Sequence, residues 1–143
     1  MIDISGGPNA EHYPVSYLDA VPEGGWTDEY KTTKIVLRRI DAGTWPMIGN
    51  RHVTFTKPFY IGIFELTQKQ VKLVSGNGNK KFVFENDMRP ADNLTFEEMR
   101  GKNEEFDYPK TKEVASESIV GRLRAKTGLA QIDLPTSYQF GCA

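Results

Sequence analysis

The chain has 143 residues, a hydrophobic content of 38% and a charged content of 26%, which indicates one globular domain with its own core. Its formal net charge of -1 gives no general attraction to nucleic acid or to an anionic membrane, and no stretch approaches the roughly 20 apolar residues of a membrane span. We therefore expect neither a nucleic-acid nor a membrane partner. The single cysteine, Cys142, excludes an intramolecular disulfide and a cysteine-rich zinc site.

Residues 1–32 are rich in glycine, proline and aromatic residues, and this composition predicts an irregular N-terminal arm. One short strand is expected near residues 15–18. The side chains expected to anchor the arm to the body, residues 33–143, are Tyr13, Tyr17, Leu18 and Trp26. The first residues lack the basic start and apolar run of a signal peptide, which leaves the compartment open.

The β-branched run 34–40 predicts the first clear strand. Alternation places Arg38 and Arg39 on opposite faces of this strand, so the two arginines do not form a patch by themselves. After a turn at 41–43, residues 44–47 are expected to pair with a neighbouring strand. Pro46 cannot donate a backbone hydrogen bond, and it therefore places that strand at an edge or a bulge.

Two further strands are predicted. Residues 51–56 alternate, with Val53 and Phe55 on one face. The nearly continuous apolar run 59–66 favours a central strand, and Gly62 within it indicates close approach by another backbone. Residues 81–84 fit either a short strand or an extended loop.

Capping boxes predict three helix starts, because a Thr is followed three residues later by Gln or Glu. The pairs are Thr67 with Gln70, Thr95 with Glu98, and Thr136 with Gln139. The first helix is expected to end at Gly76, and the second to be short because Gly101 follows. The third start is followed by only a few residues, so this end is expected to dock on the domain body, on another chain or on further sequence.

A further helix is predicted over residues 116–127, with Ile119, Val120 and Leu123 facing inward and Gly128 ending it. The positive charges of its basic residues, Arg122, Arg124 and Lys126, interact favourably with the C-terminal end of the helix. We expect these residues to stabilise that end and to aid solubility. Strands come early in the chain and helices later. The predicted fold class is therefore α+β, with short antiparallel strands and two to four helices.

Candidate chemical groups do not combine into a recognisable active site. The adjacent Glu97 and Glu98 are expected to cap and solvate a helix start. The acidic cluster of Glu104, Glu105 and Asp107 could bind calcium, but it lacks the spacing of a known calcium loop and favours a solvated turn. The two histidines, His12 and His52, have no ligand-like spacing and are expected at or near the surface. Trp26 and Trp45 lie in Gly/Pro contexts and are the residues we would place in a binding surface groove.

Several segments in chain order resemble the formylglycine-generating enzyme (sulfatase-modifying factor) domain, a variant of the C-type lectin fold. The most specific is 57–70, Lys-Pro-Phe-Tyr-Ile-Gly-Ile-Phe-Glu-Leu-Thr-Gln-Lys-Gln, which is similar to the family's Phe-Tyr-Ile-Gly strand and the helix after it. Residues 40–49 resemble the Gly-Thr-Phe-x-Met-Gly turn, and 89–96 the Arg-Pro-Val block. Residues 121–128 resemble the next helix, and 134–136 the Leu-Pro-Thr block.

The opening arm also resembles a leader of some bacterial members, and the resemblance covers about the first half of the family domain. Departures lie at its end, where Ser137, Phe140 and Gly141 replace the family's Glu, Trp and Glu. The family's catalytic cysteine pair, copper site and calcium loops lie beyond this block, so the resemblance implies no cofactor in this chain. Cys142 falls where an aromatic is usual and carries no catalytic role over.

Three hypotheses follow from the resemblance. The first is a non-catalytic or truncated member that acts as a structural or binding module. The second is the N-terminal fragment of an active formylglycine-generating oxidase. The third is a ligand-binding C-type-lectin-like display protein. Because half of a fold exposes the face that its other half covers, we expect self-association or a partner chain.

Overall fold

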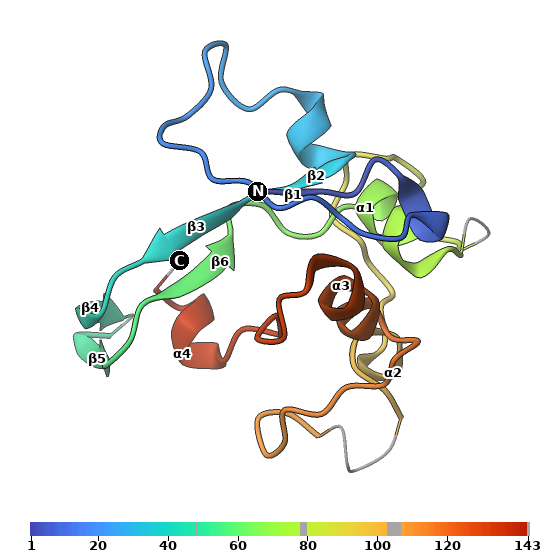
Figure 1. Ribbon diagram of the computed structural model, residues 1–143. Coiled ribbons are helices and arrows are strands. Elements are labelled where there is room, and N and C mark those ends of the chain that lie inside the picture. The colour runs from blue at the N-terminus through green and yellow to red at the C-terminus, as the bar shows by residue number, and fades with distance from the viewer. Residues whose placement is uncertain (48, 78–79, 103–106, 143) are drawn as a thin grey trace.

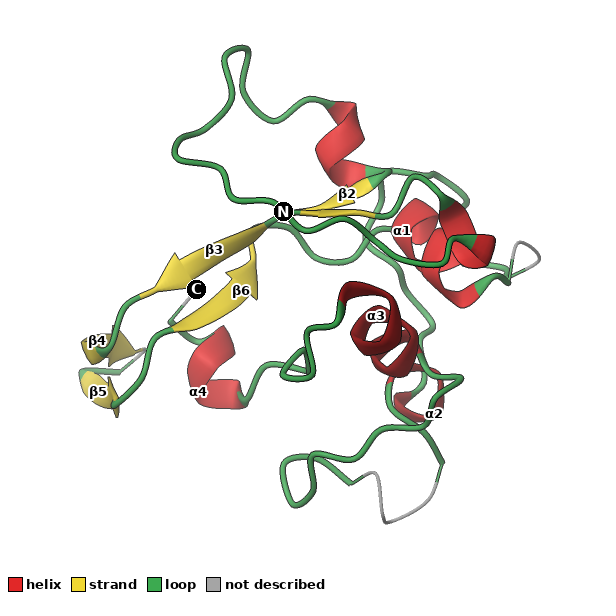
Figure 2. Cartoon of the chain, in the orientation of Figure 1, coloured by secondary structure: helices red, strands yellow, loops and turns green. Residues whose placement is uncertain are grey.

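The computed structural model describes residues 1–47, 49–77, 80–102 and 107–142, and it has an α+β fold (Figures 1 and 2). Six short strands form three two-stranded antiparallel sheets in the described part of the chain, paired β1 with β2, β3 with β6, and β4 with β5. The strands are β1 (Ile2–Asp3), β2 (Lys34–Ile35), β3 (Leu37–Ile40), β4 (Gly43–Met47), β5 (Arg51–Phe55) and β6 (Phe59–Gly62). The predicted fold class is confirmed.

Four α-helices lie in the described residues: α1 (Gln68–Ser75), α2 (Phe96–Met99), α3 (Ile119–Thr127) and α4 (Ser137–Phe140). Two 3-10 turns, η1 (Gly7–Asn9) and η2 (Asp28–Lys31), lie in the N-terminal segment. All three predicted capping boxes are present, with both reciprocal hydrogen bonds formed at α1, α2 and α4. Gly76 ends α1 in the left-handed conformation, at φ 71°, as predicted.

Helix α3 begins three residues later than predicted, because the Ser118 side chain caps it by accepting from the backbone N–H of Gly121 at 3.0 Å. Its inward residues are as expected, since Ile119, Val120 and Leu123 are buried. The core lies where α1 and α3 meet β1 and β2. Its members are Ile2, Ile4, Tyr13, Ile35, Val71, Val74, Phe82, Ile119 and Leu123.

The N-terminal segment contributes more to this core than its composition suggests. Ile2 and Ile4 are 2% and 0% exposed, and Ile2 pairs with Ile35 in the β1–β2 sheet. The strand expected at 15–18 is not there; this stretch makes only an isolated bridge, from Val15 to Ile2. The chain pairs at residues 2–3 instead, because alternating Ile2 and Ile4 can bury one face there and the residues after Val15 remain exposed.

The predicted anchors of this segment divide into two groups. Tyr13 is 2% exposed, and its hydroxyl donates to the Leu73 carbonyl of the body at 3.4 Å. Trp26 packs edge-on against Phe64 of the body, with ring centroids 6.3 Å apart. Tyr17 and Leu18 are exposed, so the prediction that they anchor the segment is wrong.

The prediction of a central strand over residues 59–66 is also wrong. β6 ends at Gly62 and has one neighbour, β3, among the described residues. A Cβ at Gly62 would lie 2.8 Å from the Phe64 carbonyl oxygen, so the backbone that approaches this glycine is the chain's own, two residues on. This bend explains why the apolar run does not continue as a strand.

Strands β4 and β5 form a hairpin that projects from the β3–β6 ribbon, away from α1 and α3 (Figure 1). Val53 and Phe55 are half-buried on one face, as predicted, and Phe55 contacts Phe59 where the hairpin joins the ribbon. Pro46 lies in a two-stranded sheet and so has an edge position, also as predicted. Residues 81–84 form a loop and not a strand, and the loop bends at Val83 and Phe84.

Candidate binding groove

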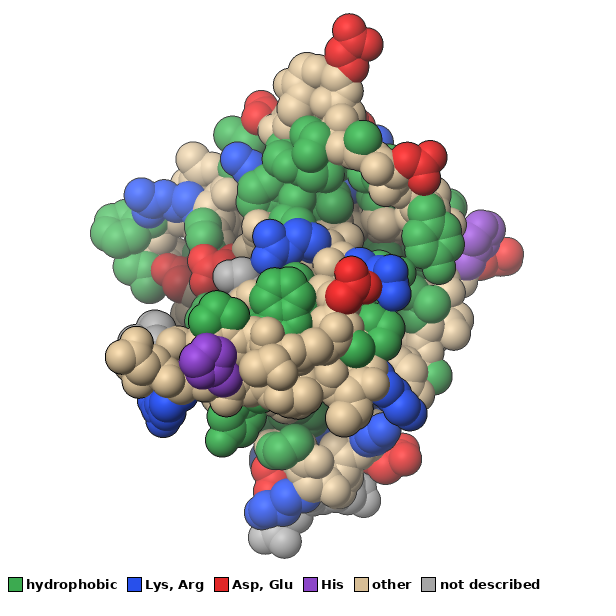
Figure 3. Space-filling model, turned by 90° about the vertical axis from the view of Figure 1, so that its left-hand side faces the viewer, with side chains coloured by type: hydrophobic (Ala, Val, Ile, Leu, Met, Phe, Trp, Pro, Cys, Tyr) green, Lys and Arg blue, Asp and Glu red, His purple; other side chains and the backbone are tan. Residues whose placement is uncertain are grey.

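An open groove of about 1300 Å³ lies between the β3–β6 ribbon, the loop of residues 15–21 and the segment 129–135 that follows α3. Its walls are largely apolar. Figure 3 shows the face of the molecule that carries the hairpin, where hydrophobic side chains gather above the hairpin with Lys and Arg side chains among them. Loops from the N-terminal and C-terminal parts of the chain thus border the same short sheet, which is an arrangement suited to binding.

The register of β3 and β6 determines which side chains share a face of the ribbon. Arg38 lies opposite Ile61, and Ile40 opposite Phe59. Because cross-strand partners lie on the same face, Arg38 stands between apolar neighbours there, while Arg39 and its partner Tyr60 lie on the other face. The prediction that the two arginines lie on opposite faces is confirmed.

The outer edge of β6 is open in the part of the chain that the structure describes. The Ile63 N–H donates to the Val36 carbonyl at 3.1 Å, and this pattern directs the backbone groups of residues 59, 61 and 63 toward β3. The backbone groups of Tyr60 and Gly62 therefore face away from β3. An exposed edge of this kind is a template for pairing with another strand.

The charges that line the groove are mainly positive. Arg38, Arg39, Lys57 and the Met1 amino group line it, with Asp19 and Asp133 as the acidic residues. Arg39 pairs with Asp41 at 3.0 Å. The Met1 amino group donates to the Ser16 carbonyl at 2.8 Å, and partial burial lowers its pKa.

Asp133 is held by a buried charge network under the groove. Arg100, whose side chain is 0% exposed, places its Nε 2.8 Å from one carboxylate oxygen of Asp133, and Arg124 donates to the other at 2.9 Å. Arg100 also donates to the carbonyls of Thr111 and Glu113, and its guanidinium lies 4.8 Å from the Tyr108 ring centroid. These contacts hold the segment 129–135, which forms one wall of the groove, against the body of the chain.

Sequence reasoning missed this network. Arg124 was expected to serve the end of α3, but its Nε donates to the Ile132 carbonyl at 2.7 Å. The local pattern around Arg100 does not indicate a buried role, because Arg100 follows a four-residue helix and its partner Asp133 lies 33 residues away. The one local sign was Asp133 itself, a carboxylate between two apolar residues, Ile132 and Leu134.

The structure separates the two tryptophans that the sequence placed in a binding surface. Trp26 lines the groove and lies against Tyr30 and Phe64. Trp45 lies in β4, outside the groove lining, and its Nε1 donates to the Asp41 carbonyl at 3.0 Å. Only Trp26 therefore belongs to the candidate site.

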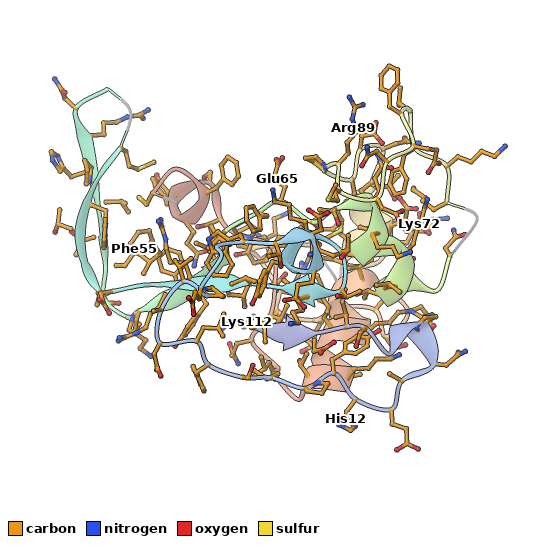
Figure 4. All side chains as sticks on the ribbon, turned by 90° about the horizontal axis from the view of Figure 1, so that it is seen from above. His12, Phe55, Glu65, Lys72, Arg89 and Lys112 are labelled. Carbon is orange, nitrogen blue, oxygen red and sulfur yellow. The ribbon has the colours of Figure 1, made fainter. Side chains whose placement is uncertain are left out.

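The other candidate residues lie apart from one another. His12 and His52 are both exposed, as predicted, and Figure 4 shows His12 at the rim of the molecule, away from the hairpin. Glu98 completes the α2 capping box and pairs with Lys80, which confirms its expected capping role. Glu104 and Glu105 lie outside the described residues, and Asp107 pairs with Lys110 at 2.6 Å. In the described ranges, no group of three or more His, Cys, Asp or Glu side chains could hold a metal ion.

Helix α4 contacts the body of the same chain, which is one of the docking modes expected for it. Gly141 lies beside Met47 of the hairpin, close enough that an added Cβ would be 3.0 Å from the Met47 Cε. Gln139 lines the groove. Tyr138 and Phe140 remain exposed, at 59% and 64%.

A second exposed apolar surface lies on the loop after α1 and includes Val83 and Phe84. Its nearby cations already have partners: Lys72 pairs with Glu85 at 2.8 Å, and the Arg89 guanidinium lies over the Phe84 ring at 5.3 Å (Lys72 and Arg89 are labelled in Figure 4). Lys72 and Arg89 beside this surface are thus already engaged by side chains of the same chain.

None of the helices in the described residues is long and apolar enough to cross a membrane. No family model matches the chain, and neither the curated proteins nor the solved structures contain a significant match to it. The resemblance to the formylglycine-generating enzyme domain therefore stays a prediction.

Proposed function

We propose that this chain is a non-catalytic module, similar to the first half of a formylglycine-generating-enzyme domain, whose role is to bind another polypeptide along the groove beside β3 and β6. The observation that carries the proposal is the groove itself, about 1300 Å³ in volume, with largely apolar walls beside a free strand edge. Contiguous exposed apolar surface of this kind marks interaction sites in soluble proteins.

The mode of binding that the geometry favours is strand addition. The free edge at Tyr60 and Gly62 supplies backbone donors and acceptors, and the adjoining groove supplies apolar contacts for alternate side chains of an incoming strand. Backbone pairing provides affinity, and the side-chain contacts provide specificity. The partner is therefore expected to be an extended segment of a second chain.

Two measurements test the proposal. Light scattering over a range of protein concentrations reports self-association, and titration with strand-forming peptides reports binding along the groove. Peptide binding in the micromolar to millimolar range is the expected result. A monodisperse monomer that binds none of the peptides would contradict the binding role.

The non-catalytic part of the proposal has its own test. Purified protein is incubated with a Cys-Thr-Pro-Ser-Arg peptide, with and without copper, and aldehyde formation is followed by mass spectrometry. We expect no turnover under either condition. Conversion of the peptide cysteine to formylglycine would refute the proposal and favour the oxidase-fragment hypothesis.

A further inference from the structure

We infer that two copies of this chain associate through residues 15–17, which pair antiparallel with the same residues of a second copy, so that the two Ser16 residues face each other. The inference goes beyond the proposed function, because the segment lies beside β1 and its free edge is separate from that of β6. The sequence predicts a strand over residues 15–18, and the pairing completes the strand that the isolated bridge at Val15 begins.

One edge of this segment is already paired with β1. The Ser16 N–H donates to the Met1 carbonyl at 2.9 Å, and the Met1 amino group donates to the Ser16 carbonyl at 2.8 Å. Because backbone groups alternate in direction along a strand, the N–H and C=O groups of Val15 and Tyr17 face away from β1. Those groups make no hydrogen bond within the described ranges of the chain. The segment is thus held in place with one edge free.

Apolar side chains continue from the core onto this segment and end in water. Val15 lies opposite Ile2, which is 2% exposed, and alternation places Tyr17 on the same face as Val15. The exposed fraction rises to 42% at Val15 and 83% at Tyr17. A further strand beside this edge would cover apolar surface that the monomer leaves in water.

The segment is also complementary to itself. In an antiparallel pair centred on Ser16, the Val15 of each copy lies opposite the Tyr17 of the other. Such pairs of a β-branched and an aromatic residue stabilise a sheet. Residues 13–18 carry no charge, so no like charges meet across the pair. The same patch serves both copies, as a two-fold interface requires.

Other strand edges of the chain are less suited to pairing with a copy of themselves. In β3 the same arrangement would place Arg38 opposite Arg38, and like charges directly opposite destabilise a sheet. Pro46 has no N–H to offer at the edge of β4. The edge of β6 lines the groove, where residues 129–135 form another wall. By contrast, the chain around His12 runs along the rim of the molecule (Figure 4).

A ladder of three residues buries little surface, so we expect a weak dimer with a Kd of roughly 10–1000 µM. Sedimentation equilibrium over a range of protein concentrations that spans this Kd measures the association. Far-UV circular dichroism verifies that each variant below folds.

Disulfide cross-linking tests the register. Residues that face each other in a non-hydrogen-bonded antiparallel pair have Cα atoms about 4.5 Å apart, which suits a disulfide. In a Cys142→Ser background, which removes the only native cysteine, Ser16→Cys should form a covalent dimer in oxidised glutathione about tenfold faster than Val21→Cys. Val21 is the matched control because it lies on the same loop, is 60% exposed and falls outside the ladder.

Charge variants at the same position test the two-fold axis. Ser16→Lys and Ser16→Glu should each weaken the dimer about fivefold, because like charges then face each other. An equal mixture of the two variants should restore association, and added salt should reduce both effects. Val21→Lys should leave the dimer unchanged.

A protein that stays monomeric at every concentration and cross-links equally through Ser16→Cys and Val21→Cys would overturn the inference. A dimer that neither Ser16 charge variant weakens would overturn it as well, and loss of that dimer in Tyr60→Lys would move the interface to β6. Peptide binding along the groove is measured separately, so the proposed function does not depend on either result.

Discussion

Replacing Asp133 by asparagine should lower the free energy of unfolding by about 3 kcal/mol, because it removes the negative charge of a carboxylate that lies 2.8 Å from the buried Arg100 guanidinium. Asparagine keeps the size of the side chain, so no cavity forms. The backbone carbonyls of Thr111 and Glu113 still accept from Arg100, but they do not balance its charge.

The magnitude follows from the burial of the three side chains. Breaking a fully buried ion pair by removing one partner costs about 3–5 kcal/mol. Arg100 is 0% exposed, but Asp133 and Arg124 keep 14% and 17% of their side-chain surface, which places the expected loss at the lower end of that range. Since a typical domain has a free energy of unfolding of only about 5–15 kcal/mol, the loss from this single substitution is a large fraction of the total stability.

The assay is urea unfolding at neutral pH, followed by circular dichroism and tryptophan fluorescence, with the midpoint and slope compared between variants. The matched control is Glu117→Gln, which removes a carboxylate from an ion pair of similar length, 2.7 Å to Arg122, at a side chain that is 81% exposed. The control should lose no more than about 1 kcal/mol. In both variants the slope should stay unchanged.

The double substitution Asp133→Asn with Arg100→Met sharpens the test, because it removes the buried cation as well as its counter-ion. It should be less destabilising than the sum of the two single substitutions, since contacting residues couple. A loss in Asp133→Asn no larger than that of Glu117→Gln, or strict additivity in the double variant, would refute the description of Arg100 and Asp133 as a buried charge pair.

Three further substitutions test local features of the fold. Thr67→Ala should cost about 1–3 kcal/mol of unfolding free energy, because Thr67 is 2% exposed and its hydroxyl both caps α1 and donates to the Lys31 carbonyl at 2.6 Å. Gly121→Ala should destabilise by about 1–3 kcal/mol or more, although alanine favours helix, because its Cβ would lie 2.1 Å from the Ala115 carbonyl oxygen. Hydrogen bonds from Lys80 and from the Thr95 backbone N–H lower the pKa of Glu98 below its ordinary 4.5. The ionised Glu98 carboxylate therefore contributes its full stabilisation above about pH 4.5, and this stabilisation is lost as the pH falls through the lower pKa that Glu98 has in the folded protein. Glu98→Gln should therefore be less stable than the parent at pH 7 and equal to it in strong acid.

Urea unfolding at one pH measures the first two substitutions, and a pH series measures the third. A stabilised Gly121→Ala variant would show that helix propensity outweighs the close approach of the Ala115 carbonyl. A Thr67→Ala variant as stable as the parent would show that the Thr67 cap does not stabilise the fold. A difference between the parent and Glu98→Gln that stays constant from pH 7 into acid would refute the assignment of the low pKa to Glu98.

Helix starts were predictable because they depend on residues three apart in the chain. The Thr67–Gln70 and Thr95–Glu98 boxes need no information about the rest of the fold, and both form. Strand pairing is different, since an apolar run such as 59–66 has the same composition whether it lies in the middle of a sheet or bends away after Gly62.

The groove could not be predicted for the same reason, since its walls come from residues 15–21, the β3–β6 ribbon and residues 129–135. Nothing in the local pattern indicates that these segments meet. The glycine- and proline-containing contexts of Trp26 and Trp45 predict both near the surface, but they do not indicate that Trp26 lines the groove and that Trp45 lies in the hairpin outside it.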